Sequence, residues 1–347
     1  MAGDGGNLSV ARHGRPGANL LTDRQQVGIT LGPVSERTIG LLHPGEMGAA
    51  VGQCLAAAGH RVLWVPEGRS PASAARAEAA GLTGVDLAEL VRSAEVIMSV
   101  CPPHAALDTA REVARAGFGG LYVDANAISP ATAREVAAIV ADGGAGCVDG
   151  GIIGTPPVRP GFIRLYLSGP RAGEVYQLFE DTPVDTRLVD HASQGAGRAG
   201  GADSAGGADS AGGADSAGGA SRAARDGGIG AASAVKVAYA SWTKGSAALL
   251  LAARALARAQ GVEDVLLAEW GLSQPGLEER SARAARSATS KGWRWVAEME
   301  EIAATMGAAG LPEGFHLAAA EIYRRSPHAE ATALDAVLGA LRSGSER

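Results

Sequence analysis

The sequence predicts an α/β protein in which a doubly wound parallel sheet is followed by an all-helical C-terminal domain. Three observations predict it. From Arg37 to about residue 193, short apolar runs alternate with helix-like runs. The segment Thr38 to Gly52, TIGLLHPGEMGAAVG, passes from an apolar strand through a glycine-bearing turn into an alanine-rich helix. Beyond Gly228 the pattern is helical to the end. Strands that alternate with helices of this length form βαβ units, which build parallel sheets through right-handed crossovers.

The individual elements follow from this alternation. The expected strands are Arg37–Leu42, Arg61–Val65, Val96–Val100, Gly120–Asp124, Gly146–Val148, Arg164–Ser168 and Thr186–Val189. The expected helices are Ala49–Ala58, Pro71–Ala80, Asp86–Arg92, Ala105–Ala116, Pro130–Ala141 and a long one from Ala231 to about Ala257. The long helix would span about 40 Å at about 1.5 Å per residue, enough to cross from one domain to another.

Four regions of different composition divide the chain. We expect a disordered, Gly-, Arg- and Ser-rich extension over residues 1–36 and a dinucleotide-binding domain over residues 37–194. Residues 195–227 contain three copies of GGADSA and no large apolar side chain in those copies, so we expect a flexible linker. Residues 228–347 form the helical domain.

Composition excludes several classes of protein. A net charge of −6 and a pI near 5.7 argue against general nucleic-acid binding, which needs clustered Lys and Arg. The three cysteines, Cys54, Cys101 and Cys147, lack the spacing of a disulfide framework or a zinc site, so no metal is expected. The first 36 residues lack a sustained apolar run, so we expect no signal peptide, and no 18-residue apolar stretch free of charge occurs elsewhere. We therefore expect a soluble, cytoplasmic protein with a small-molecule substrate and no membrane partner.

The glycine turn after the first strand is the clearest candidate site. In a Rossmann-type βα turn, free backbone N–H groups at the helix N-terminus bind the pyrophosphate of a dinucleotide, and glycines let it approach. Gly45 and Gly48 occupy the second and third glycine places of the GxGxxG pattern, whereas His43 occupies the first. We assign the whole turn to the cofactor: His43, Pro44, Gly45, Glu46, Met47 and Gly48.

The end of the second strand, VLWVPEGRS, bears on which nicotinamide cofactor is used. An acidic residue here binds the ribose 2′-OH of NAD, whereas an Arg and a hydroxyl hold the 2′-phosphate of NADP. Glu67 suits the first role, and Arg69 with Ser70 suits the second. The sequence favours NADP and leaves NAD open. We also assign Val100, Cys101 and Pro102, which end the strand beginning at Val96, to the cofactor edge.

Four stretches together resemble the β-hydroxyacid dehydrogenase and 6-phosphogluconate dehydrogenase superfamily. They are IGLLHPGEMG (39–48), DANAISP (124–130), DGGIIGTP (149–156) and GIGAASAVKVAYASWTKG (228–245). The chain looks most like a bacterial branch whose helical C-terminal domain has no settled function. The resemblance implies hydride transfer between NADP(H) and an alcohol or carbonyl substrate, with Lys236 as the catalytic acid and base.

The residues around Lys236 support a site on the long helix. Lys236, Tyr239, Ala240, Thr243 and Lys244 fall at helical spacings that place them on one face. Two lysines, a phenol and a hydroxyl are not a normal packing stripe on an otherwise apolar helix. Lysines that simply reach into solvent are the alternative, because long side chains do so readily.

Several positions depart from the family pattern. The family's asparagine four residues after the lysine is Ala240 here, and two of its serines correspond to Ile153 and Asn126. Loss of these hydrogen-bonding groups implies a substrate other than a plain 3-hydroxy acid. The candidate substrate-contacting residues are Asn126, Ile153, Gly154, Thr155, Tyr239, Ala240 and Thr243. An imine reductase and a non-catalytic dinucleotide-binding protein remain as alternatives.

The helical domain is expected to form a homodimer. Its long first helix has apolar residues over more than one face. Four of the five tryptophans lie in this half, at 242, 270, 293 and 295. We expect them to form core, with a pocket lined by Trp293 and Trp295 as the alternative.

Overall fold

The computed structural model describes residues 36–156, 160–189, 228–328 and 334–343. The predicted N-terminal extension, apart from Glu36, and the predicted linker 195–227 with its repeats lie outside these residues. All the described residues belong to one compact unit of the chain.

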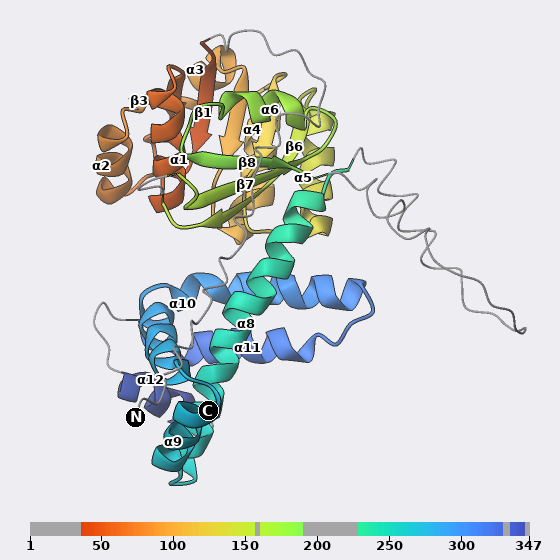
Figure 1. Cartoon of the computed structure of the whole chain (residues 1–347). Coiled ribbons are helices and arrows are strands. Elements are labelled where there is room, and N and C mark those ends of the chain that lie inside the picture. Colours follow the sequence, from red (N-terminus) through yellow and green to blue (C-terminus); the bar gives the residue numbers. More distant parts are fainter. Residues whose placement is uncertain (1–35, 157–159, 190–227, 329–333, 344–347) are drawn as a thin grey trace, which may run out of the picture. The chain divides into compact units, whose positions relative to one another are not determined.

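Eight strands form a single sheet in the order β3-β2-β1-β4-β5-β6-β7-β8 (Figure 1). They are β1 (Thr38–Leu42), β2 (Arg61–Trp64), β3 (Thr83–Gly84), β4 (Val96–Ser99), β5 (Leu121–Asp124), β6 (Gly146–Gly154), β7 (Ile163–Ser168) and β8 (Val184–Leu188). The first six are parallel. Because the chain runs outward from β1 in both directions, the strand order reverses between β1 and β4. Ligands of doubly wound sheets bind at such a switch point, beyond the carboxyl ends of the strands.

The far edge of the sheet departs from the predicted all-parallel arrangement. β7 runs antiparallel to β6, with Gly154 opposite Ile163, and β8 is again parallel to β7. A parallel pair would need a crossover of a dozen or more residues. The connection over residues 155–162 is too short for that, so the chain returns as a hairpin. β6 also continues to Gly154, well beyond the predicted end at Val148.

Two apolar layers cover the faces of the sheet, because alternate strand residues point to opposite sides. In β4, Val96 and Met98 join one layer and Ile97 joins the other. The helices of this half are α1 (Glu46–Ala57), α2 (Pro71–Ala79), α3 (Leu87–Ser93), the 3₁₀ turn η1 (Pro103–Ala105), α4 (Ala106–Arg115), α5 (Pro130–Asp142) and α6 (Ala172–Leu178). Residues of α1, α2 and α6 pack in the first layer, and those of α3, α4 and α5 pack in the second.

The C-terminal half is helical, as predicted. Its helices are α8 (Ala231–Ala259), α9 (Glu263–Ser273), α10 (Leu277–Ala308), α11 (Gly314–Arg325) and α12 (Leu334–Ser343). A third apolar core joins α8, α10, α11 and α12. The N-terminal part of α8 packs on β6 and β7 (Figure 1), so one long helix belongs to both halves. The predicted class, a doubly wound α/β domain followed by an all-helical one, is confirmed.

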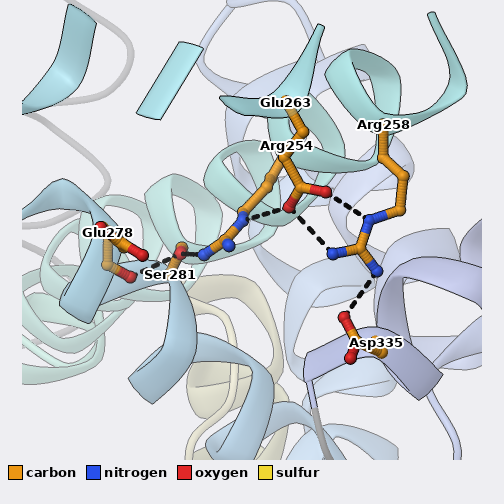
Figure 2. Close-up of polar contacts among 6 residues, drawn as sticks. All are labelled: Arg254, Arg258, Glu263, Glu278, Ser281 and Asp335. Atoms are coloured by element: carbon orange, nitrogen blue, oxygen red, sulfur yellow. Dashed lines mark hydrogen bonds and ion pairs between the residues drawn. The ribbon is translucent and has the colours of Figure 1, made fainter. Parts of the chain in front are cut away.

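A buried arginine connects the helices at the far end of α8 (Figure 2). Arg254 donates to Glu263 Oε1 at 2.8 Å and to Ser281 Oγ at 2.6 Å. Arg258 reaches the same carboxylate and also Asp335. These contacts link α8 to α9, α10 and α12. Because the Arg254 charge is buried, it needs these partners, and the network fixes the positions of the four helices.

Candidate functional site

The turn between β1 and α1 has an uncommon backbone conformation at His43 and an open helix N-terminus at Gly45. His43 adopts φ +64°, the left-handed conformation that glycine adopts readily. For a residue other than glycine this conformation costs about 1–3 kcal/mol and is found mainly at functional sites. Gly45 is the N-cap of α1 and provides no side-chain cap. The first N–H groups of α1 are therefore left for a ligand or solvent.

The glycines of this turn have different roles. A Cβ on Gly48 would lie 2.5 Å from the carbonyl oxygen of His43, so α1 packs against the end of β1 only without a side chain there. A Cβ on Gly45 would meet no protein atom within 4 Å. Gly48 is thus required by the fold, whereas the space at Gly45 is open for a ligand.

Two buried polar atoms, one in this turn and one in the loop after β2, have no hydrogen-bond partner within the described ranges. They are Nδ1 of His43 and Nε of Arg69. Burial, together with the nearby charge of Arg69, lowers the pKa of His43 to about 4, so its imidazole is neutral at physiological pH. A buried guanidinium nitrogen without an acceptor fits a ligand that carries phosphate oxygens. These residues therefore fit a nicotinamide dinucleotide.

The start of α2 adds residues that sequence reasoning missed. Ser70 caps this helix by accepting the N–H of Ser73. Arg76 donates to Ser73 Oγ at 3.1 Å and to the carbonyl of Pro44 at 3.4 Å. Two arginines and two hydroxyls therefore lie beside the glycine turn, while Glu67 is exposed. The Ser-x-x-Ser-x-x-Arg spacing at a helix start was the signal available in the sequence.

The end of β4 is held by Asn126, a predicted substrate residue. Its Oδ1 accepts the N–H of Cys101 at 2.6 Å, and its Nδ2 donates to Asp124 and to Ser99. The side chain is thus engaged within the protein. Burial raises the pKa of the Cys101 thiol to about 11, so this thiol is neutral. Val100 is half-buried and Pro102 is exposed at the same edge.

Asp149, on β6, fastens the start of α8 to the sheet. Its carboxylate accepts hydrogen bonds from the backbone of Gly230 and Ser233 and from the hydroxyls of Ser233 and Ser168, all between 2.6 and 3.0 Å. A carboxylate at a helix N-terminus is also favoured by the helix dipole. The DGG motif thus supplies a helix cap, a role that sequence reasoning did not assign to it.

Lys236 lies one turn further along α8, against β6. A Cβ on Gly151 would lie 2.6 Å from the carbonyl oxygen of Ala232 and 3.3 Å from Cβ of Lys236, so only glycine allows this approach. Nζ of Lys236 donates to the carbonyl of Ile152 at 2.5 Å. Burial lowers the pKa of Lys236 to about 8; Glu298 acts against this shift and Lys244 adds to it. A lysine of this kind exchanges protons near neutral pH.

The predicted face of α8 is only partly brought together. Lys236 and Lys244 both point to the interior, and Lys244 pairs with Glu298 of α10. Ala240 lies in the helical core and is only 2% exposed. Tyr239 is exposed, and Thr243 donates its hydroxyl to the carbonyl of Tyr239.

The predicted substrate-contacting residues at the end of β6 also differ in their exposure. Ile153 is buried within the sheet. Gly154 has φ +128° and lies against the backbone of Phe162, while Thr155 is exposed. Of the tryptophans, Trp270 is buried, whereas Trp242 and Trp293 are exposed rather than in the core.

Helix α10 reaches the glycine turn. Lys291 lies 3.7 Å from Glu46, at the first position of α1, and α10 also contacts η1 beyond β4. The turn, Lys236 and α10 therefore surround the same end of the sheet. Within the described ranges, no cluster of three or more His, Cys, Asp or Glu side chains could hold a metal ion. None of the described helices is both long and apolar enough to span a membrane.

A glycine turn at the switch point of a doubly wound sheet defines a dinucleotide-binding domain. Comparison with known families agrees: residues 38–172 match the NAD binding domain of 6-phosphogluconate dehydrogenase, and residues 257–326 match a domain of unknown function, DUF1932. The two matched segments follow one another along the chain in the order of the sheet and the helical half. No curated protein matches the sequence.

Solved structures of the same fold are distant in sequence. The 3-hydroxyisobutyrate dehydrogenase of Mycobacterium tuberculosis is 20% identical, with a TM-score of 0.59 over 89% of this chain and 100% of that one. The Salmonella typhimurium 3-hydroxyisobutyrate dehydrogenase is 16% identical, with a TM-score of 0.58 over 88% and 99%. A conserved hypothetical protein from Sinorhizobium meliloti 1021 is 21% identical, with a TM-score of 0.57 over 89% and 97%. At these identities the likeness shows the fold.

Proposed function

We propose that the protein is an NADP-dependent oxidoreductase that interconverts an alcohol and a carbonyl compound, with Lys236 as general acid and base. The observation that carries the proposal is the placement of Lys236. It is held against β6 by Ile152, its pKa is lowered to about 8, and it lies at the end of the sheet where the glycine turn opens. The NAD-binding domain and the dehydrogenases of similar fold support this class of reaction.

The chemistry divides between cofactor and protein. A reduced nicotinamide, when bound, supplies the hydride that adds to the carbonyl carbon. The ammonium of Lys236 gives its proton to the carbonyl oxygen, so that the oxygen becomes a hydroxyl and Lys236 becomes neutral. In the reverse direction the neutral amine takes the hydroxyl proton. Asp149 and Gly151 keep Lys236 in place for both steps.

The residues that would hold the cofactor lie in the glycine turn and around the start of α2. The N–H groups of α1 and the space at Gly45 suit the pyrophosphate. Arg69, Arg76 and the hydroxyls of Ser70 and Ser73 suit a ribose 2′-phosphate, because charge-assisted hydrogen bonds are about twice as strong as neutral ones. This group of residues favours NADP over NAD.

An imine is a second candidate substrate. Ala240 and Ile153 stand where the resembling family has groups that hold a substrate carboxylate and hydroxyl, and both are buried apolar side chains here. A substrate without a carboxylate needs neither group. In this reaction Lys236 would protonate nitrogen instead of oxygen.

The active form is proposed to be a homodimer built on the helical half. Among the described residues, every exposed large apolar side chain except Leu188 lies beyond residue 228. Trp242, Leu249 and Leu256 form a stripe along α8 at intervals of seven residues, and each is more than 60% exposed. Apolar surface on this scale marks an interaction site, and a second copy carries the same surface.

The experiment that tests the function is NADPH oxidation with a panel of ketones, aldehydes and imines. Turnover with any member, lost in Lys236→Ala, supports the proposal. NADPH binding without hydride transfer to any member of a broad panel would instead favour a non-catalytic dinucleotide-binding protein.

A further inference from the structure

Lysine is rare in this chain, and its positions are concentrated. The sequence contains 28 arginines but only three lysines: Lys236, Lys244 and Lys291. All three lie around the site. Lys236 donates a hydrogen bond to the carbonyl of Ile152, Lys244 pairs with Glu298, and Lys291 pairs with Glu46. Arginine stays protonated in proteins, whereas a buried lysine can lose its proton. Lys236, whose pKa burial lowers to about 8, is therefore a cation of this site whose charge can change.

Glu298 of α10 is fixed against the second of these lysines. Nζ of Lys244 donates to Glu298 Oε2, and the ring of Trp295 lies 5.3 Å from the same Nζ. The hydroxyl of Tyr323 donates to the backbone carbonyl of Lys244 at 2.6 Å, which holds this turn of α8. Glu298 is only 6% exposed, so its carboxylate is confined in this position.

The other oxygen of Glu298 is unused. Oε1 is buried and has no hydrogen-bond partner among the residues that the structure describes. A buried carboxylate oxygen is ordinarily satisfied, because leaving it without a partner costs about 1–3 kcal/mol or more. A proton donor that moves to it would restore the missing bond. Lys236 is on the same side of α8 as Lys244, two turns earlier.

The charged groups around Lys236 come from three elements. Lys244 lies on its own helix, and Glu298 lies on α10. On β6, Lys236 contacts the uncharged carbonyl of Ile152. The nearby carboxylate of Asp149 accepts hydrogen bonds from Ser233 in the first turn of α8. Further along α10, Glu300 pairs with Arg324, and Glu301 accepts hydrogen bonds from Ser129 and Thr132. The free carboxylate oxygen of Glu298 is thus the available anion.

We propose that Glu298, held in place by Lys244, is a positioning residue for Lys236: its carboxylate favours the protonated amine and its free oxygen offers that amine a second acceptor. The DUF1932 domain thereby controls the charge of a lysine that contacts the nucleotide-binding sheet. The consequence for catalysis rests on the proposed function. The effect on ionisation of Lys236 does not, because it requires neither cofactor nor substrate.

The small number of lysines makes a direct measurement possible. Reductive methylation with ¹³C-formaldehyde labels three side chains and the N-terminus, and Lys236→Arg assigns the signal of Lys236. Its pKa is then read from an NMR titration. Glu298→Gln should lower that pKa by about one unit, because an opposite charge is lost, and Lys244→Met should raise it, because a like charge is lost. Glu298→Asp should restore most of the wild-type value.

A Lys236 pKa that falls in Glu298→Gln and rises in Lys244→Met is a result that a merely structural role of Glu298 would not give. An unchanged pKa of Lys236 in folded Glu298→Gln, or shifts in the same direction in both variants, would overturn the proposal. If Glu298→Gln does not fold, Glu298→Met, which also removes the charge, takes its place, and an unchanged pKa of Lys236 in that variant overturns the proposal in the same way. Opposite shifts without turnover on any substrate would leave this inference standing and reject the proposed function.

Discussion

Ser233 and Asp149 are joined by two hydrogen bonds across the two halves of the chain. Ser233 donates its hydroxyl to Asp149 Oδ1 at 2.6 Å and its N–H to Oδ2 at 3.0 Å. Three residues later, Lys236 meets the carbonyl of Ile152, three residues beyond Asp149 on β6. The same strand and the same turn of α8 therefore position both the helix cap and Lys236.

Removing the Ser233 hydroxyl should destabilise the protein. Ser233→Ala leaves a buried oxygen of Asp149 with one hydrogen bond fewer, which costs about 1–3 kcal/mol. Urea unfolding measures the free energy of unfolding. Ser290→Ala is the matched control, since Ser290 is an exposed serine of α10 bonded only to its own helix. Equal losses in the two variants would show that the cap contributes nothing.

Gly45 and Gly48 should respond differently to the same change. Gly45→Val places its side chain in open space, so the protein should fold but lose NADPH affinity. Gly48→Val brings a side chain onto the His43 carbonyl and should lower the melting temperature. Calorimetric titration with NADPH and thermal unfolding distinguish the two. A folded Gly45→Val protein with unaltered affinity would remove the turn from the cofactor site.

Arg69 and Arg76 should set the choice between the two nicotinamide cofactors. Replacing either by Ala should weaken NADPH binding much more than NADH binding, because only NADPH carries the 2′-phosphate. Arg61→Ala is the control, since Arg61 is exposed at the opposite end of β2. Binding titrations with both cofactors give the answer. Equal losses for the two cofactors, or a wild-type preference for NADH, would make Glu67 the determinant.

The apolar stripe of α8 should be covered in solution. Leu249→Glu introduces a charge in its centre and should convert a dimer into monomers at micromolar concentration. Leu188→Glu, at an exposed leucine on β8, should leave the dimer intact. Analytical ultracentrifugation of the wild type and the two variants measures their oligomeric states. A wild-type protein that sediments only as a monomer would refute the homodimer.

Much of the fold could be predicted from the sequence because its periodicity is strong. The turn at Gly45, the long helix beginning at Ala231 and the doubly wound arrangement were all visible as patterns. β3 has only two residues, Thr83 and Gly84, and no periodicity can reveal so short a strand. The reversal at β7 depends on the length of a connection, which alternation alone does not indicate.

The site could be predicted in outline but not in its contacts. Lys236 was found through a family pattern and its helical spacing. Helical spacing alone does not say which neighbour covers a face, so Ala240, in the apolar core, was grouped with Lys236. Glu298 lies 54 residues beyond Lys244 in the sequence, and only tertiary packing brings the two together. Counting the lysines would have drawn attention to all three positions.

Single-turnover hydride transfer measures whether Lys236 carries the proton. With an active substrate found, Lys236→Ala should slow carbonyl reduction by about 10² to 10⁴ while NADPH affinity stays within a few fold. In the wild type, reduction needs the protonated lysine. Because its pKa is about 8, the rate should fall as the pH rises through that value, and alcohol oxidation should show the opposite trend. A mutant that transfers hydride as fast as the wild type across this pH range would contradict the account.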